Sequence, residues 1–174
     1  EKVVDYLLSK GHEKIAIITS AREDESIGRL RLEGYYRALK RHGMEPNPLL
    51  VKYMHPELGS YTMENGYALT KELLEENADF TALYVISDRM AIGACKAIFD
   101  SGKTVPGDYS VVGFDGLELA QFYNPSITTL RQPMEEMAKA TIHMLFEMIH
   151  KKGGGQRMLF EGKLIEAQSV RDIH

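Results

Sequence analysis

The sequence contains two apolar runs that each end in an aspartate, Thr81-Ala-Leu-Tyr-Val-Ile-Ser-Asp88 and Tyr109-Ser-Val-Val-Gly-Phe-Asp115. Both have the composition of buried strands, and the segment between them, from Asp88 to Ser101, has the spacing of a helix. In an open parallel sheet the carboxyl ends of the strands form the crevice in which ligands bind. We therefore expect Asp88 and Asp115 to line one site, and binding is the first functional hypothesis.

The same alternation extends toward the start of the chain. We expect helices over residues 1–10, 26–42 and 61–77, and strands over 14–19 and 49–54. Parallel strands need crossover connections, which helices usually supply. The pattern therefore predicts an α/β fold in which helices cover both faces of a parallel sheet, a three-layer α/β/α architecture.

The pattern changes after the second of these aspartates. A short apolar segment over 117–123 precedes a strand expected at 127–132, and Pro133 can open a helix. That helix carries an apolar stripe that needs a partner surface: Met134, Met137, Ala138, Thr141, Leu145, Met148 and Ile149. A last strand or hairpin is expected at 158–170.

The composition is that of a globular protein of ordinary domain size: 174 residues, 44% hydrophobic, 26% charged, with a formal net charge of -4. This mild acidity gives no general attraction for nucleic acid or an anionic membrane, so residues outside this sequence would have to contact any DNA. No apolar run reaches the roughly 18 residues of a transmembrane helix. The one cysteine, Cys95, is expected in the core, and an oxidising compartment gains no support.

Arg31 is an anomaly on its expected helix. At about 100° per residue it lies in the middle of the apolar face, one turn from Ile27 and from Tyr35. One interpretation is that it buries its stem and pairs its guanidinium with a nearby aspartate or with water. The other places the guanidinium in the crevice, where it grips hydroxyl, carboxylate or phosphate oxygens of a ligand. Both interpretations put Arg31 near the strand ends.

Each of the other candidate residues has a structural alternative. Asp88, with Ser87 before it, stands where a helix begins, so helix capping explains it as well as ligand contact does. Asp115 could be a turn aspartate before Gly116, although it is the better ligand candidate because no long helix begins there. Tyr61 opens a helix at the same rim, where its ring could stack on a sugar or a base, or could belong to the surface or core.

Signatures of catalysis are missing from the sequence. It contains no glycine-rich phosphate loop, no nucleophile motif and no cysteine or histidine spacing for a metal, so we predict a non-enzymatic protein without a cofactor. Two rival classes fit less well. A phosphoryl-accepting domain would need acidic residues after the first strand, where Thr19 and Ser20 stand. A sugar-cleaving enzyme that used Asp88 and Asp115 as its carboxylate pair lacks any supporting motif.

Several segments together resemble one family, the lactose-repressor and galactose-repressor (LacI/GalR) type of bacterial transcription regulators. They occur in the family's order over nearly the whole chain, and although each is weak alone, jointly they are specific. The matching segments are Gly11-His-Glu-Lys-Ile-Ala16, Arg31-Leu-Glu-Gly-Tyr35 with Ala38-Leu39, Val85-Ile-Ser-Asp-Arg-Met-Ala-Ile-Gly93, Val105-Pro-Gly-Asp108, Ser110-Val-Val-Gly-Phe-Asp-Gly116 and Asn124-Pro-Ser-Ile-Thr-Thr-Leu-Arg-Gln-Pro133.

This resemblance implies a periplasmic-binding-protein-like type I effector domain, in which two α/β subdomains hold a sugar or a related metabolite in the cleft between them. It also implies a cytoplasmic homodimer that binds operator DNA through a helix-turn-helix domain and changes DNA affinity when the effector binds. The helix that carries Ile92 resembles one used for dimer contact. The nearest alternative, a periplasmic sugar-binding protein of a transport system, shares the fold, but the segment Thr128-Thr-Leu-Arg-Gln-Pro133 favours the regulator.

The resemblance further implies how the sequence divides. We expect residues 12–124 and 156–174 to form the C-terminal subdomain, and residues 1–11 and 125–155 to be crossover elements of the N-terminal subdomain. The chain opens on Glu1 and on a helix already under way, as a piece of a longer protein would. On this interpretation the DNA-binding domain lies outside the sequence. The stripe on the last long helix then packs on the other crossover elements or on another chain.

Carried over position by position, the family's ligand-binding residues fall on six side chains. Arg31 matches the effector-gripping arginine, and Asp115 matches the aspartate that accepts hydrogen bonds from hydroxyl or amine groups. Tyr61 matches an aromatic that stacks on the ligand, and Gln132 matches a hinge-side residue that faces the cleft. The other two match an Asn-Asp or Thr-Asp pair at the cleft rim, where serine shortens the reach: Ser87 and Asp88.

Overall fold

The computed structural model describes residues 1–22, 27–151 and 157–174, so the expected helix start at Ser26 lies outside the described residues. Strands and helices alternate along them, with two short 3-10 helices. The elements are α1 (Lys2–Ser9), β1 (Ile15–Thr19), α2 (Ile27–Arg41), η1 (Pro48–Leu50), β2 (Val51–Tyr53), η2 (Pro56–Leu58), α3 (Met63–Glu75), β3 (Ala82–Val85), α4 (Asp88–Asp100), β4 (Ser110–Asp115), α5 (Glu118–Phe122), β5 (Thr128–Arg131), α6 (Met134–Lys151) and β6 (Lys163–Ile165).

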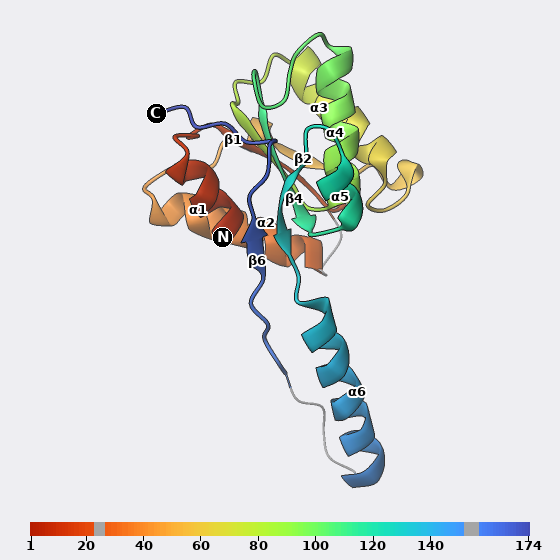
Figure 1. Cartoon of the computed structure of the whole chain (residues 1–174). Coiled ribbons are helices and arrows are strands. Elements are labelled where there is room, and N and C mark those ends of the chain that lie inside the picture. Colours follow the sequence, from red (N-terminus) through yellow and green to blue (C-terminus); the bar gives the residue numbers. More distant parts are fainter. Residues whose placement is uncertain (23–26, 152–156) are drawn as a thin grey trace.

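The strands form one sheet in the order β2-β1-β3-β4-β5-β6. All neighbours are parallel except β6, which pairs antiparallel with β5. The chain runs outward from β1 to β2 and then back past β1, and right-handed crossovers in opposite directions put their helices on opposite faces. Accordingly α1 and α2 cover one face, and α3, α4 and α5 cover the other (Figure 1). The predicted three-layer α/β/α architecture is confirmed.

The central strands are buried on both faces. Every residue of β1 and of β3 is buried, as expected for a parallel sheet between helical layers. Tyr35 of α2 is buried beneath the sheet and donates its hydroxyl to the carbonyl of Ile15. Cys95 is fully buried, as predicted, and burial raises the pKa of its thiol to about 12, so it serves as an apolar core residue.

Two glycines let α3 and α4 pack with their backbones in contact. A Cβ atom on Gly66 would lie 1.9 Å from the carbonyl oxygen of Met90, and one on Gly93 would lie 1.9 Å from that of Met63. Any side chain at either position would therefore push the two helices apart. This contact fixes α4, whose first residue is Asp88, against the sheet.

Two strands are shorter than predicted. Residues 48–50 form η1 instead of extending β2, because Pro48 opens a turn and the Asn47 side chain accepts a hydrogen bond from the Leu49 amide. Near the C-terminus only Lys163–Ile165 pair as a strand, within the region expected at 158–170. The chain beyond β6 is held largely by side-chain bonds.

Two segments expected to be crossover elements of the N-terminal subdomain contact the sheet and its core, and the division into subdomains stays a prediction. β5 pairs with β4 from Thr128 to Arg131, so it is a strand of this sheet. Helix α1 buries Val4 and Leu7 completely in the same core. The physical reason is that both segments present apolar or β-branched side chains which this sheet and α2 can cover.

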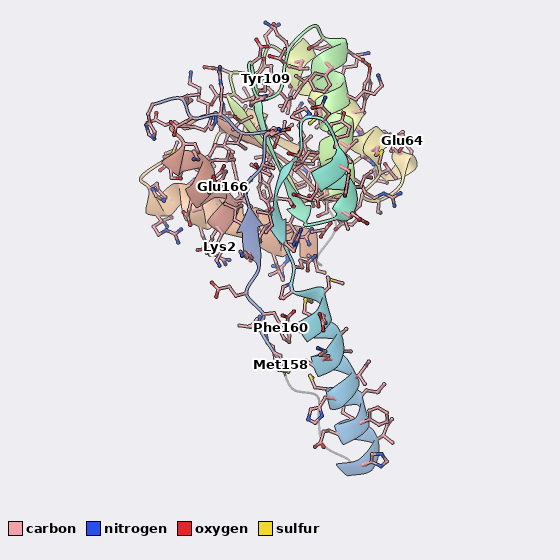
Figure 2. All side chains as sticks on the ribbon, in the orientation of Figure 1. Lys2, Glu64, Tyr109, Met158, Phe160 and Glu166 are labelled. Carbon is pink, nitrogen blue, oxygen red and sulfur yellow. The ribbon has the colours of Figure 1, made fainter. Side chains whose placement is uncertain are left out.

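Helix α6 behaves differently, because it projects away from the sheet and its layers (Figure 1). Met158 and Phe160 lie on the segment that returns from the far end of α6 to the body (Figure 2). The apolar side chains of the helix remain largely exposed, with Ile142 and Phe146 each at 56%. Within the described residues, the partner surface that the stripe requires is not present.

Neither α6 nor any other helix within the described ranges is both long and apolar enough to cross a membrane.

The α3–α4 contact makes the fold sensitive to a single methyl group. We expect Gly66→Ala to lower the free energy of unfolding by about 1–3 kcal/mol, because the backbone of α4 must move to admit the Cβ atom. Urea denaturation measures this, with Glu64→Ala on the exposed side of the same helix as the control. Equal stability of the two variants would show that the helices do not pack this closely.

Candidate functional site

Arg31 reaches the edge of the sheet that the carboxyl ends of the strands form. It lies on the second turn of α2, and its Nη1 donates to the carbonyl of Ile86, the residue that follows β3. β1 and β3 are neighbours in the sheet, yet the helices that follow them cover opposite faces. Open α/β sheets bind ligands at such a switch point. The topology therefore places this guanidinium where a ligand is expected.

The guanidinium of Arg31 is nearly withdrawn from water, with 12% of the side chain exposed. Its Cζ lies 3.8 Å from the centroid of the Phe114 ring, and its Nη2 lies 3.5 Å from Oδ1 of Asp115. Its Nε is buried and has no hydrogen-bond partner within the described residues. The arginine is thus paired with an aspartate, as one interpretation predicted, and still has an unused donor.

Asp115 ends β4 with an unusual backbone. Its φ is 116°, a value that residues with a side chain seldom adopt, and the following Gly116 has φ of 75°. The side chain is 26% exposed, so its carboxylate combines a buried ion pair with access to solvent. Burial raises the pKa of Asp115, while Arg31 and hydrogen bonds from Gln132 and Ser87 act in the opposite direction. The group is therefore an acceptor held among donors.

Gln132 and Ser87 complete this cluster. Gln132 follows β5 directly, and its Nε2 donates to Oδ1 of Asp115 at 2.7 Å. Ser87 is almost fully buried at the N-cap position of α4, its hydroxyl makes no capping bond, and it lies near enough to Asp115 to act against the rise of that carboxyl's pKa. Four of the six predicted residues are therefore brought together from α2, β4 and the turns after β3 and β5.

Asp88 differs from the prediction of ligand contact, because it has no exposed surface. Its Oδ1 accepts a hydrogen bond from Oγ1 of Thr129, and its Oδ2 accepts one from the backbone N of Leu117, each at 2.6 Å between the two heavy atoms. In the described contacts it does not cap its own helix either. Burial raises its pKa from 3.8 to about 6. The carboxylate lies behind the cluster, where a ligand could reach it only after a rearrangement.

Tyr61 lies at the same edge of the sheet but apart from the cluster. It stands eight residues after the end of β2, and its backbone amide donates to the sulfur of Met54, the residue that follows this strand, at 3.3 Å. Its φ is 58° and its side chain is half-buried. Stacking of this ring on a ligand stays a prediction.

Sequence reasoning missed two residues of this region. Phe114 supports the guanidinium of Arg31, and Thr129 binds Asp88. Each lies inside an expected strand, and strand alternation alone does not tell which face meets a site. A weak signal existed for Phe114, because an aromatic next to the strand-end aspartate is well placed to stack on an arginine.

The cluster can bind polar ligands. A guanidinium fork, a carboxylate, a hydroxyl and a primary amide offer both donors and acceptors within one partly buried edge. Across the ranges 1–22, 27–151 and 157–174 the structure holds no group of acidic, histidine or cysteine side chains placed to hold a metal ion. The arrangement suits recognition of hydroxyl, carboxylate or phosphate groups.

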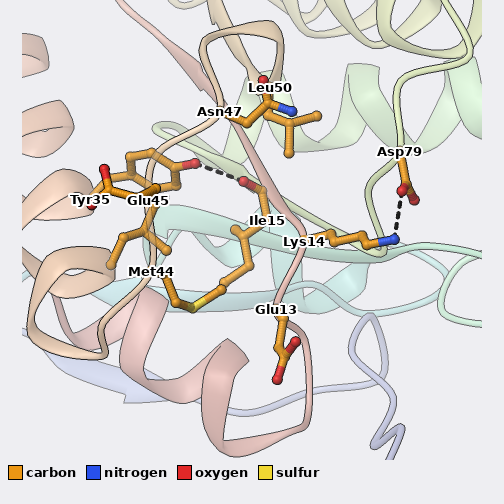
Figure 3. A pocket seen from close by; sticks show the side chains of 10 residues that line it. Glu13, Lys14, Ile15, Tyr35, Met44, Glu45, Asn47, Leu50 and Asp79 are labelled. Atoms are coloured by element: carbon orange, nitrogen blue, oxygen red, sulfur yellow. Dashed lines mark hydrogen bonds and ion pairs between the residues drawn. The ribbon is translucent and has the colours of Figure 1, made fainter.

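A separate hollow lies at the opposite edge of the sheet (Figure 3). It measures about 190 Å³ and is lined by acidic and apolar residues, including Glu13, Glu45 and Met44. Its cation, Lys14, is paired with Asp79. The hollow is far from the switch point, so it does not extend the Arg31 cluster.

The fold and this cluster define a periplasmic binding protein-like domain, and the family model with that description matches residues 4–170. The HTH-type transcriptional regulator MalR of Clostridium butyricum is 37% identical over 143 residues, which are 82% of this chain and 41% of MalR. A sugar-binding transcriptional regulator of the LacI family from Escherichia coli, in complex with phosphate, superposes with a TM-score of 0.87 at 33% identity, covering 99% of this chain and 60% of that one.

A dimeric Lac repressor with a C-terminal deletion superposes equally well, with a TM-score of 0.87 at 28% identity over 98% of this chain and 60% of that one. The chain belongs to the LacI/GalR family, within the periplasmic binding protein-like class. It spans about half the length of the relatives it matches, from 41% for MalR to 50% for the repressor ExuR of Bacillus subtilis.

The buried Asp88 predicts a pH dependence of stability. Its pKa rises from 3.8 to about 6 on folding, so between these values the folded chain binds more protons than the unfolded chain. Its contribution is therefore fully present below about pH 4 and falls by up to about 3 kcal/mol as the pH rises to about 6. Urea unfolding between pH 4 and 7 measures the slope, and Asp88→Asn removes this component.

The comparison with Asp88→Asn is needed because buried His12 acts in the opposite direction: burial lowers its pKa, so its contribution grows as the pH rises. That residue is unchanged in the variant. Parallel pH profiles for the native chain and Asp88→Asn would contradict the prediction.

Proposed function

We propose that this chain is part of the effector-binding region of a LacI-type transcriptional regulator, and that its ligand is a sugar or a related polyhydroxylated metabolite. The cluster of Arg31, Asp115 and Gln132 carries the proposal. A sugar hydroxyl both donates and accepts hydrogen bonds, so it can accept a hydrogen bond from Arg31 while donating one to Asp115. The description of the similar E. coli regulator as sugar-binding supports this ligand class.

The other predicted residues take roles that follow from their positions. Ser87 lies near Asp115 and would add a hydroxyl to the same group of polar atoms. Tyr61 marks the far end of the strand edge, where its ring would stack on an extended ligand. Asp88 lies behind these residues, where it has no exposed surface.

The regulator is proposed to bind its effector without chemical change and to act in the cytoplasm. Operator DNA would be contacted by a helix-turn-helix domain outside this sequence, since the net charge of -4 gives no attraction for DNA. A periplasmic sugar-binding protein of a transport system has the same fold. The relatives named as transcriptional regulators favour the regulator over that alternative.

The exposed stripe on α6 supports the proposal that a second subdomain covers it and supplies the other wall of the cleft. Gln132 lies just before α6, so the proposed ligand site and the stripe are adjacent along the chain. The relatives have at least as many residues outside the matched region as inside it. Effector binding would then alter how α6 and the second subdomain sit against the sheet.

The regulator is also proposed to be a homodimer, joined through the outer face of α3 and α4. This face holds an apolar hollow of about 580 Å³ whose lining includes Leu58, Met63, Tyr67, Ile92 and Tyr123. The similar Lac repressor structure is a dimer, which favours a second copy as the occupant. Apolar hollows of this kind commonly anchor such contacts.

Replacing Arg31 tests the ligand site. In the full-length regulator we expect Arg31→Lys to weaken binding of the sugar found by thermal-shift screening by about 10-fold to 100-fold, because lysine keeps the charge but loses the fork. Isothermal titration calorimetry measures the change. The control, Arg29→Lys, alters an exposed arginine on the same helix. Native affinity in Arg31→Lys would remove this residue from the site.

Replacing Leu58 tests the dimer face. We expect Leu58→Glu to raise the dimer dissociation constant at least about 10-fold, because a carboxylate would be buried in the apolar hollow. The matched control is Leu49→Glu: both leucines lie in 3-10 helices and are partly or largely exposed, but Leu49 is not among the residues that line the hollow. Sedimentation velocity over a concentration series distinguishes them, and equal behaviour would place the interface elsewhere.

A further inference from the structure

The side chain of Asp88 joins three segments that surround the proposed ligand site. It belongs to the first turn of α4. It accepts one hydrogen bond from the amide of Leu117, in the loop after β4, and another from the hydroxyl of Thr129 on β5. Both carboxylate oxygens are therefore engaged with groups from other elements. An aspartate at a helix start usually serves its own helix, so this use is unusual.

The strand pair beneath Asp88 leaves its carboxylate little freedom. Gly113 of β4 pairs in register with Thr129 of β5, and a Cβ atom on Gly113 would lie 2.3 Å from Oδ1 of Asp88. The missing side chain of this glycine makes the space that the carboxylate occupies. The location of the carboxylate is thus set by the register of β4 and β5.

The loop after β4 is held by the same pair of residues. Asp115 and Gly116 both have positive φ, and such backbone persists only where its surroundings fix it. The Gly116 amide donates to Oγ1 of Thr129, and the Leu117 amide donates to Asp88. The two amides that follow Asp115 are therefore both bound by the Asp88–Thr129 pair.

The pair also fixes the donor that faces Asp115 from the other side. Gln132 follows Thr129 by three residues at the end of β5, where its backbone amide and its side-chain amide both donate to Asp115. Holding Thr129 therefore holds the strand end from which Gln132 reaches the carboxylate. Asp88 is the common anchor of both partners in this contact.

We propose that Asp88 is a positioning residue of the ligand site: it holds Asp115 and Gln132 within reach of Arg31 and does not itself touch the ligand. The part of this inference that concerns the ligand rests on the proposed function. The part that concerns the loop and β5 does not, because it follows from contacts within the chain.

Hydrogen exchange measured by NMR on the 174-residue chain tests whether Asp88 holds the loop after β4 and the end of β5. We expect Asp88→Asn and Thr129→Val to speed exchange of the Leu117 and Gly116 amides about tenfold or more, and to shift the side-chain amide signals of Gln132. Thr129→Ser, which keeps the hydroxyl, should restore native exchange. The matched control is Asp108→Asn, since Asp108 also accepts a backbone amide and a hydroxyl, both from Thr104, but at a distant loop.

A general loss of stability would speed exchange throughout the core, including the amides of β1, and would overturn the proposal if it accounted for the whole effect. Unchanged exchange at Leu117, or unchanged Gln132 signals, would also overturn it. The pattern that supports positioning is a change confined to the loop and to Gln132, reversed by serine at position 129.

A second experiment tests the effect on ligand binding. It measures the affinity of the full-length regulator for a panel of pentoses, hexoses and their phosphates. For any compound that binds the native protein, we expect Asp88→Asn to weaken binding about tenfold while Asp108→Asn leaves it unchanged. Native affinity in Asp88→Asn would overturn the proposal. If no compound in the panel binds the native regulator, the proposed sugar ligand fails, while the exchange experiment still decides the role of Asp88.

Discussion

A guanidinium withdrawn from water at the ends of β3 and β4 is the constraint that the rest of the site satisfies. A buried cation is costly unless it is paired, and Arg31 is paired with the Ile86 carbonyl and the Asp115 carboxylate and stacked on the Phe114 ring. Because these groups come from β3 and β4, the arginine also ties α2 to the strand ends. A ligand oxygen that reached this edge would meet charges already in place.

The sheet supplies the rigidity that this arrangement needs. β1 and β3 are buried along their whole length, and α4 is fixed by its backbone contact with α3, so the residues at the strand ends have little freedom. Helix α6 contrasts with this body, because its apolar stripe is exposed. The chain thus joins a rigid sheet to a helix whose apolar face is uncovered within the described residues.

The sequence predicted the architecture and the proximity of Arg31 to Asp115, because both follow from local rules. Apolar runs that alternate with amphipathic segments specify a covered parallel sheet, and strand-end placement brought Asp115 together with Arg31. The short β2 was missed because the turn at Pro48 depends on one side-chain bond from Asn47. The burial of Asp88 was missed because it depends on Thr129, which is 41 residues away in the chain.

The two aspartates obey the same strand-end rule and yet differ in role, and the helical layers explain the difference. Asp115 ends its strand and turns toward Arg31, which comes from α2 on one face of the sheet. Asp88 opens α4, which covers the other face, so its carboxylate is directed onto β4 and β5 at the space left by Gly113. A strand-end carboxylate can therefore face a ligand only if the next helix does not cover it. At this edge the residue that ends a strand is open to binding, and the residue that begins a helix supports it from behind.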